Sequence, residues 1–194
     1  MKTIQLFCVH TLFFAASLLL ILSITLPAQA VTAQQVTSPG GIKAWFVADH
    51  TNPILTVKFT FRGGAALDPA GKEGLSNLVS GLLDEGAGDL KSTAFQQTLE
   101  DFAIRLSFSA GRDEFGGSMK TLVRNQDMAF KLLRLSLSNP RFDTEPVERI
   151  RSQILVGLKQ KSEDPHSIAS QTLFKTLYPT HAYGRPTDGT IGSV

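Results

Sequence analysis

Apolar and polar residues alternate over 55–61 and again over 104–108, a period of two that predicts strands with one buried face. A short apolar run over 42–48 predicts an earlier strand. After a glycine-led turn, the segment 114–123 has the composition of a returning strand, so it is expected to form a hairpin with the strand before it.

Helical spacing begins after these first strands. Over 74–88 the apolar residues follow the i, i+3, i+4, i+7, i+8 spacing of a buried helical stripe, and they are Leu75, Leu78, Val79, Leu82 and Leu83. Capping residues predict three further helices: one from an N-cap at Ser92, one from Asn125 to Asn139, and one over 145–163 capped by Thr144. A fourth is predicted to start at Asp164-Pro165, because proline fits the first helical position.

The predicted order is therefore two strands, two helices, a hairpin and three helices. Runs of strands and runs of helices favour the α+β class, here a largely antiparallel sheet with helices packed on one face. The pattern reaches Val194 without a closing element, so the domain over 42–194 is expected to be incomplete at its carboxyl end.

The amino terminus has the pattern of a secretory leader. Lys2 is followed by no charged residue before Lys43, the run 12–26 is almost wholly apolar, and the small-x-small sequence that ends at Ala30 resembles a signal peptidase site. We expect residues 1–30 to be a cleaved signal peptide, cut after Ala30.

Cleavage would place the protein in the periplasm or outside the cell, with 31–41 as a linker and no stable membrane anchor. The alternative is an uncleaved anchor over residues 4–26. Cys8, the single cysteine, lies in the leader, so the mature chain has no thiolate for a disulfide or a metal.

Composition narrows the function further. The 194 residues carry 19 Lys and Arg against 17 Asp and Glu, a net charge of +2, and the basic residues do not cluster. A nucleic-acid surface needs such a cluster, so no nucleic-acid partner is expected.

The polar side of the helix predicted over 74–88 carries the candidate chemistry. Asn77, Ser80 and Gly81 stand at i, i+3 and i+4, the spacing at which an inverted zinc motif, H-x-x-E-H, places two imidazoles and a general-base carboxylate. An amide, a hydroxyl and a bare backbone stand there instead. The sequence thus has the spacing of a metal site without its ligands.

Four segments occur in the order seen in the M16 metallopeptidases, the family of insulinase, pitrilysin and the mitochondrial processing peptidases. They are FRGGAALDPAGKEGLSNLVSGLLDEGA, LSFSAGRDEFGGSMKTL, NPRFDTEPVERIRSQIL and LYPTHAYGRPTDGTIGSV. The chain over 41–194 resembles the greater part of that family's first α+β domain.

The resemblance assigns a role to each lost position. In active members the first histidine would fall on Asn77, the general-base glutamate on Ser80 and the second histidine on Gly81. The distal glutamate ligand would fall on or near Gly157, 76 residues after Gly81. Active members hold zinc, whereas no cofactor and no catalytic residue are expected in this chain, because its residues supply too few donors.

The resemblance therefore implies an exported, non-catalytic M16 subunit that pairs with a zinc-bearing M16 subunit and binds peptide or unfolded polypeptide. Edge strands rich in Ser, Thr and Gly are suited to adding such a peptide. One alternative is a zinc metalloendopeptidase with a non-standard or partner-completed site. The other is a purely structural M16-like subunit.

The remaining histidines do not suggest a substitute metal site. His50 is expected in a turn, His166 at a helix start and His181 in an aromatic loop, and no H-x-x-H or H-x-H pair occurs. A solvated or packing role is the prediction for all three.

Overall fold

The computed structural model describes residues 32–194, so the predicted leader and its cleavage site at Ala30 lie outside the described residues. The chain divides between Asn52 and Pro53 into two compact units. Across 32–194, no helix combines the length and apolar character that crossing a bilayer requires.

The first unit contains an antiparallel hairpin of β1 (Ala33–Thr37) and β2 (Lys43–Val47). β2 confirms the strand predicted over 42–48. β1 lies inside 31–41, where an irregular linker was expected. The Ser38 N–H donates to the Ile42 carbonyl at 2.8 Å, and Gly41 adopts a φ of 84° that favours glycine. This tight turn gives the polar segment a partner strand.

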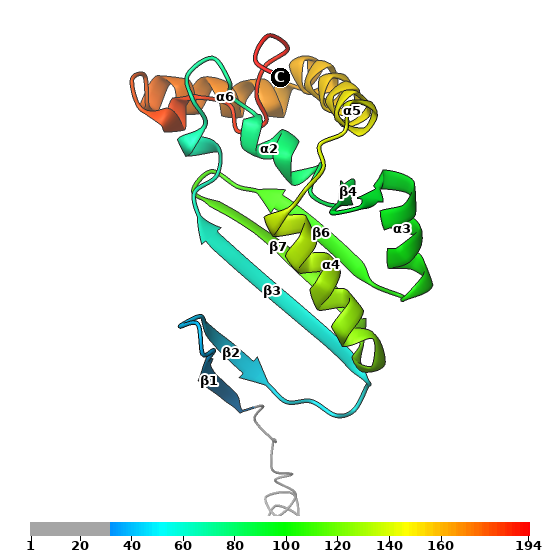
Figure 1. Ribbon diagram of the computed structural model, residues 1–194. Helices are drawn as coiled ribbons and strands as arrows, with labels where there is room; N and C mark the ends of the chain where they lie inside the picture. Colours follow the sequence, from blue (N-terminus) through cyan, green and yellow to red (C-terminus); the bar gives the residue numbers. More distant parts are fainter. Residues whose placement is uncertain (1–31) are drawn as a thin grey trace, which may run out of the picture. The chain divides into compact units, whose positions relative to one another are not determined.

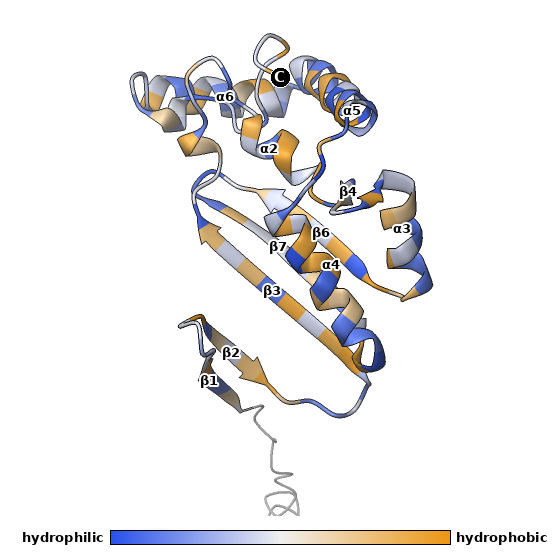
Figure 2. Cartoon of the chain, viewed as in Figure 1, coloured by the Kyte–Doolittle hydropathy of each residue, from blue (hydrophilic) through white to orange (hydrophobic). Residues whose placement is uncertain are grey.

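The second unit is built on a three-stranded antiparallel sheet in the order β3-β7-β6 (Figure 1). The strands are β3 (Ile54–Arg62), β6 (Arg105–Ala110) and β7 (Glu114–Leu122). Hydropathy alternates along β3, as Figure 2 shows. The period-two prediction and the hairpin of β6 with β7 are both confirmed.

Gly117 of β7 lets two aromatic rings close over the sheet. It pairs with Phe59 on one side and Phe108 on the other, and the two ring centroids are 6.2 Å apart. A Cβ atom on Gly117 would lie 2.6 Å from the Phe59 ring. Any larger residue here would push the rings apart.

Five helices accompany the sheet: α2 (Leu75–Ser80), α3 (Ser92–Asp101), α4 (Gln126–Ser138), α5 (Thr144–Glu163) and α6 (Pro165–Leu177). Short elements lie between them, namely β4 (Gly86–Ala87), β5 (Leu90–Lys91) and the 3-10 turns Ala65–Leu67, Val123–Asn125 and Ala182–Gly184. The order of strands and helices is that of the α+β class predicted from the sequence.

The core lies between one face of the sheet and the helices α3 and α4 (Figure 1). Phe95 of α3, Met119 of β7 and Leu132 of α4 meet there with almost no exposed surface. The polar residues of β3 and β6 are exposed, whereas Thr121 of β7 is buried with 3% of its surface exposed. Helices on one face of the sheet are what the sequence predicted.

The predicted caps were less accurate than the helices. Ser92 and Thr144 are the first residues of α3 and α5, after Lys91 and Asp143, and neither is a cap. The cap predictions at Ser92 and Thr144 are therefore wrong by one residue, and the Ser92 hydroxyl donates to Glu85 instead. Asn125 is the N-cap residue of α4, as predicted, but its side chain makes no capping hydrogen bond, and its amide donates to the Phe102 carbonyl at 2.6 Å instead. The helix start predicted at Asp164-Pro165 is confirmed, since Pro165 is the first residue of α6, and Asp164 also accepts from the Ser167 N–H at 2.8 Å.

Candidate functional site

The helix that carries the lost metal motif is much shorter than its sequence pattern predicts. α2 ends at Ser80, and the chain continues in turns to β4 rather than as a helix to residue 88. Leu82 and Leu83 are buried, as the apolar stripe predicts, but they pack from this turn segment. Leu75 is 42% exposed, so the stripe prediction is wrong at the start of the helix.

A buried carboxylate that the sequence pattern did not single out holds the start of α2. Asp68 is 4% exposed and accepts hydrogen bonds from the Gly74 N–H, the Ser76 N–H (both 3.0 Å) and the Ser76 hydroxyl at 2.5 Å. The first N–H groups of a helix lack partners within it, and a negative charge there is favourable. Asp68 thus caps α2 from outside its own sequence.

Arg185 holds this cap in place from the other end of the chain. Its guanidinium donates to the carbonyls of Asp68 at 2.8 Å and Ala66 at 3.1 Å. It also lies 3.9 Å from the Glu73 carboxylate. The aromatic loop near the carboxyl end therefore helps to determine where α2 begins.

At the position of the general base, Ser80 is buried and already bonded. Its hydroxyl donates to the Asn77 carbonyl at 2.8 Å, and it is 8% exposed. A serine hydroxyl keeps its proton near neutral pH unless a base adjoins it. Ser80 stabilises the end of a short helix and cannot act as a general base for water.

At Gly81, the position of the second histidine, a side chain from another helix occupies the space beside the backbone. An ideal Cβ atom built on Gly81 would lie 2.9 Å from Cγ2 of Ile150 on α5, closer than carbon atoms pack. Ile150 thus takes the space where a ligand side chain would begin.

Gly157, at the position of the distal glutamate, is different. It follows Ile150 by seven residues, two turns along the same side of α5, but nothing lies within 4 Å of its ideal Cβ position. Close packing therefore explains the absence of a side chain at Gly81 and does not explain it at Gly157.

The turn after α2 is fastened to α5 by an ion pair. Arg149 donates to both Glu85 carboxylate oxygens, at 2.6 and 3.2 Å, and the Ser92 hydroxyl donates to the same carboxylate at 2.5 Å. Burial opposes ionisation of Glu85, yet the Arg149 and Ser92 hydrogen bonds lower its pKa. The pair fixes α5 against the segment that contains Gly81.

Asp84, next to Glu85 in the sequence, has a raised pKa, whereas that of Glu85 is lowered. Burial raises the pKa of Asp84 to about 6, and the neighbouring charge of Glu85 adds to the shift. Asp84 is thus partly protonated in mildly acidic solution, and its ionised form costs the fold stability.

We next ask whether the side chains at the four motif positions could bind zinc. Catalytic zinc in proteins takes three nitrogen or oxygen ligands and keeps one open position. Gly81 and Gly157 have no side-chain donor, Asn77 offers one weak amide oxygen, and Ser80 is bonded to the backbone. In residues 32–194 no three His, Cys, Asp or Glu side chains gather where they could hold a metal ion. The residues at these positions therefore do not fit a catalytic zinc ion.

The structure also locates the histidines of the described chain. The Nδ1 atom of His181 accepts from the Tyr183 N–H at 3.2 Å, and its ring lies edge to face with Tyr183 at 4.7 Å. This confirms its packing role. His50 lies between β2 and β3, and His166 lies in the first turn of exposed α6.

These elements define a class of protein, an α+β domain with the framework of an inverted-zinc metallopeptidase and no metal ligands in that framework. The family model for Insulinase (Peptidase family M16) matches residues 44–191. The chain belongs to this family, as the sequence motifs suggested.

Two relatives carry informative descriptions. The non-peptidase homolog YmxG of Helicobacter pylori is 28% identical over 181 residues, which make up 93% of this chain and 42% of that protein. The structure of a peptidase M16 inactive domain from Pseudomonas fluorescens is 26% identical, with a TM-score of 0.78, and covers 84% of this chain and 40% of that chain. The chain thus spans less than half the length of these relatives.

The fold extends to a more distant structure. Pitrilysin superposes with a TM-score of 0.73 at 15% identity, over 86% of this chain and 18% of its own. At that identity the similarity is one of fold, and it confirms the M16-like α+β architecture predicted from the sequence.

Proposed function

We propose that this chain is a non-catalytic M16 subunit, exported to the periplasm, that binds extended peptide and pairs with a zinc-bearing M16 subunit. The single observation that carries the proposal is the state of the motif helix: Ser80 is bonded to its own backbone and Ile150 occupies the space beside Gly81. The helix is kept by capping and packing although its ligands are absent.

Two relatives support the non-catalytic part of the proposal. One is described as a non-peptidase homolog and the other as an inactive M16 domain. Each similarity covers most of this chain, and the family match spans the α2 segment and α5.

The edge of the sheet supports peptide binding. β6 is the outer strand of the β3-β7-β6 sheet, and within residues 32–194 no strand pairs with its free edge. The unpaired N–H and C=O groups of such an edge can add an extended peptide as a further strand. Ser107 and Ser109 of β6 are polar positions on this strand.

Co-purification from the native host tests the pairing. An affinity tag on the chromosomal copy should recover a second M16 chain that contains an intact H-x-x-E-H motif. Peptidase activity should reside in the pair and be absent from this chain alone. A homogeneous monomer without an M16 partner would disprove the pairing.

Metal analysis tests the non-catalytic assignment separately. The purified full chain, dialysed against trace zinc, should contain far less than one zinc per molecule. Stoichiometric zinc would overturn the assignment and would favour a site completed in some other way. The amino-terminal residue of the exported protein, found by mass spectrometry, tests export and cleavage after Ala30.

A further inference from the structure

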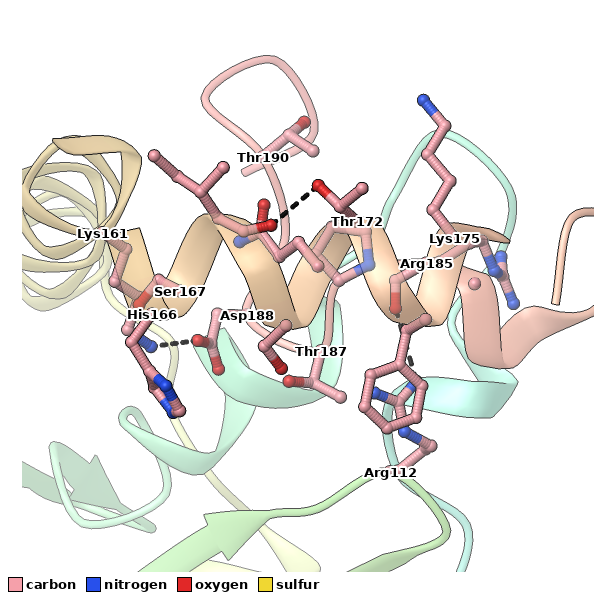
Figure 3. Close-up of a pocket in the computed structure, with 16 residues that line it drawn as sticks. Arg112, Lys161, His166, Ser167, Thr172, Lys175, Arg185, Thr187, Asp188 and Thr190 are labelled. Atoms are coloured by element: carbon pink, nitrogen blue, oxygen red, sulfur yellow. Dashed lines mark hydrogen bonds and ion pairs between the residues drawn. The ribbon is translucent and has the colours of Figure 1, made fainter. Parts of the chain in front are cut away.

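A hollow of about 540 Å³ lies between α6 and the loop 184–190, and it includes none of the four motif positions (Figure 3). We propose that it binds a polyhydroxylated small molecule that carries a phosphate or carboxylate group. The volume is in the range of about 300–1,000 Å³ that is typical of small-molecule sites. The proposal does not depend on the function proposed above.

Arg112, from the turn between β6 and β7, forms part of the wall. Its guanidinium carbon lies 4.3 Å from the centre of the Phe174 ring and 5.4 Å from that of Tyr183. Its Nη1 atom donates to the Tyr183 carbonyl at 2.7 Å. The side chain is therefore held in one orientation before any ligand binds.

Two of the donor atoms of Arg112 remain available. Among the described residues its Nε and Nη2 atoms form no hydrogen bond, and the guanidinium forms no ion pair. A planar guanidinium with two free N–H groups matches the paired oxygens of a phosphate or carboxylate. Carbonyl oxygens satisfy part of its hydrogen bonding but leave its charge uncompensated.

The charge of the hollow favours an anion. Its lining contains four permanent cations, Arg112, Lys161, Lys175 and Arg185, against one carboxylate, Asp188. Lys161 pairs with Asp188, so this acid is already neutralised. Lys175 of α6 is exposed and forms no ion pair within residues 32–194. Arg185 lies 3.9 Å from the Glu73 carboxylate, so the positive charge that remains in the lining is that of Arg112 and Lys175.

Neutral polar side chains suggest what the rest of the ligand resembles. Ser170, Gln171 and Thr187 line the same hollow, and their side chains form no hydrogen bond in the part of the chain that the structure describes. Hydroxyl and amide groups on a cavity wall are suited to the hydroxyls of a sugar or polyol. A phosphorylated or acidic sugar combines both requirements.

Calorimetric titration of the full chain tests the site with four probes: glucose 6-phosphate, glucuronate, glucose and inorganic phosphate. We expect the first two to bind and glucose to fail, and the phosphate and carboxylate arms show which anion is preferred. Failure of both anionic sugars would overturn the proposal. Binding of inorganic phosphate as tight as that of glucose 6-phosphate would also overturn it, since only an adventitious ion would then be held.

Two variants locate the binding. Lys175→Gln should weaken it about fivefold, in keeping with one partly exposed charge, and Arg112→Lys should weaken it about tenfold or more, because the forked donors are lost. Lys159→Gln, which removes an exposed charge from α5 outside the hollow, is the control. Because Arg112 also ties the loop, the exposed Lys175 decides the test: if K175Q binds as tightly as K159Q, the site is wrong.

Discussion

Ile150 of α5 stands against the bare backbone of Gly81, with its Cγ2 atom 2.9 Å from where a Cβ atom would be. The contact joins the end of the motif helix to the helix that bears Gly157. It makes the two glycines of the lost metal site physically different, because one is packed and the other faces open space.

The two glycines should respond oppositely to alanine. Gly81→Ala forces Ile150 to move and should lower the free energy of unfolding by about 1–3 kcal/mol, the usual cost of overpacking. Gly157→Ala adds a methyl group in open space within α5 and should raise it by about 0.5–1 kcal/mol. Urea denaturation of the two variants measures both effects. Equal effects would show that Ile150 does not restrict residue 81.

The same contact should limit any attempt to restore zinc. The combined substitution Asn77→His, Ser80→Glu, Gly81→His and Gly157→Glu supplies the full donor set, but the side chain at 81 meets Ile150. Adding Ile150→Ala should tighten zinc binding by about tenfold, corresponding to about 1.4 kcal/mol of relieved strain. Titration against a coloured chelator measures the affinity. Equal affinity with and without Ile150 would contradict the steric argument.

Asp68 should contribute strongly to stability through the start of α2. Asp68→Ala leaves the Gly74 N–H and the Ser76 N–H and hydroxyl without their acceptor, which should cost about 2–3 kcal/mol. Asp68→Asn keeps one acceptor oxygen and should cost about half as much. Thermal unfolding followed by circular dichroism measures the order of stability. The exposed Asp101→Ala variant of α3 serves as control and should be within about 0.5 kcal/mol of the natural chain.

Asp84 predicts a pH dependence. Its pKa rises from 3.8 in the unfolded chain to about 6 in the fold. The folded state therefore binds the proton more tightly, and stability falls as the pH rises through the window from 3.8 to about 6. Asp84→Asn should stabilise the protein at pH 7 by roughly 1 kcal/mol after allowance for solvent screening.

The stabilisation by Asp84→Asn should vanish at acidic pH, below the unfolded-state pKa of 3.8, where the natural side chain is protonated in both states. Urea midpoints measured at neutral pH and at this acidic pH for the natural chain and the variant provide the comparison. A benefit that stays constant with pH would assign the effect to packing instead of ionisation.

Much of the fold could be predicted because its signals are local. Alternation along β3 and β6 and the spacing of Phe95 and Leu99 on α3 depend only on neighbouring residues, and the structure confirms them. The position of the N-cap at Asn125 was predicted, but the hydrogen bonds that the Ser92 and Asn125 side chains make could not be predicted from spacing. Glu85 and Phe102, which lie at a distance in the sequence, compete for these side chains.

In the candidate site, too, some residues could be predicted from the sequence and others depend on tertiary contacts. The positions of Asn77, Ser80, Gly81 and Gly157 came from motif spacing and resemblance, which need no coordinates. Asp68 and Arg112 gave no comparable signal, because their roles depend on tertiary contacts, such as that between Arg112 and Tyr183, 71 residues apart. A buried acid before a glycine-led helix is the only pattern that could have indicated Asp68, and it is a weak one.

The sequence by itself determined the family, the α+β class and the loss of the zinc donors, because ligand identity is written directly in residue types. Only the tertiary structure decided how the motif helix survives. It is cut to six residues, capped from Asp68, and closed by Ile150 at Gly81 while Gly157 stays open. Packing between distant segments sets these features, and no local pattern of apolar and polar residues encodes it.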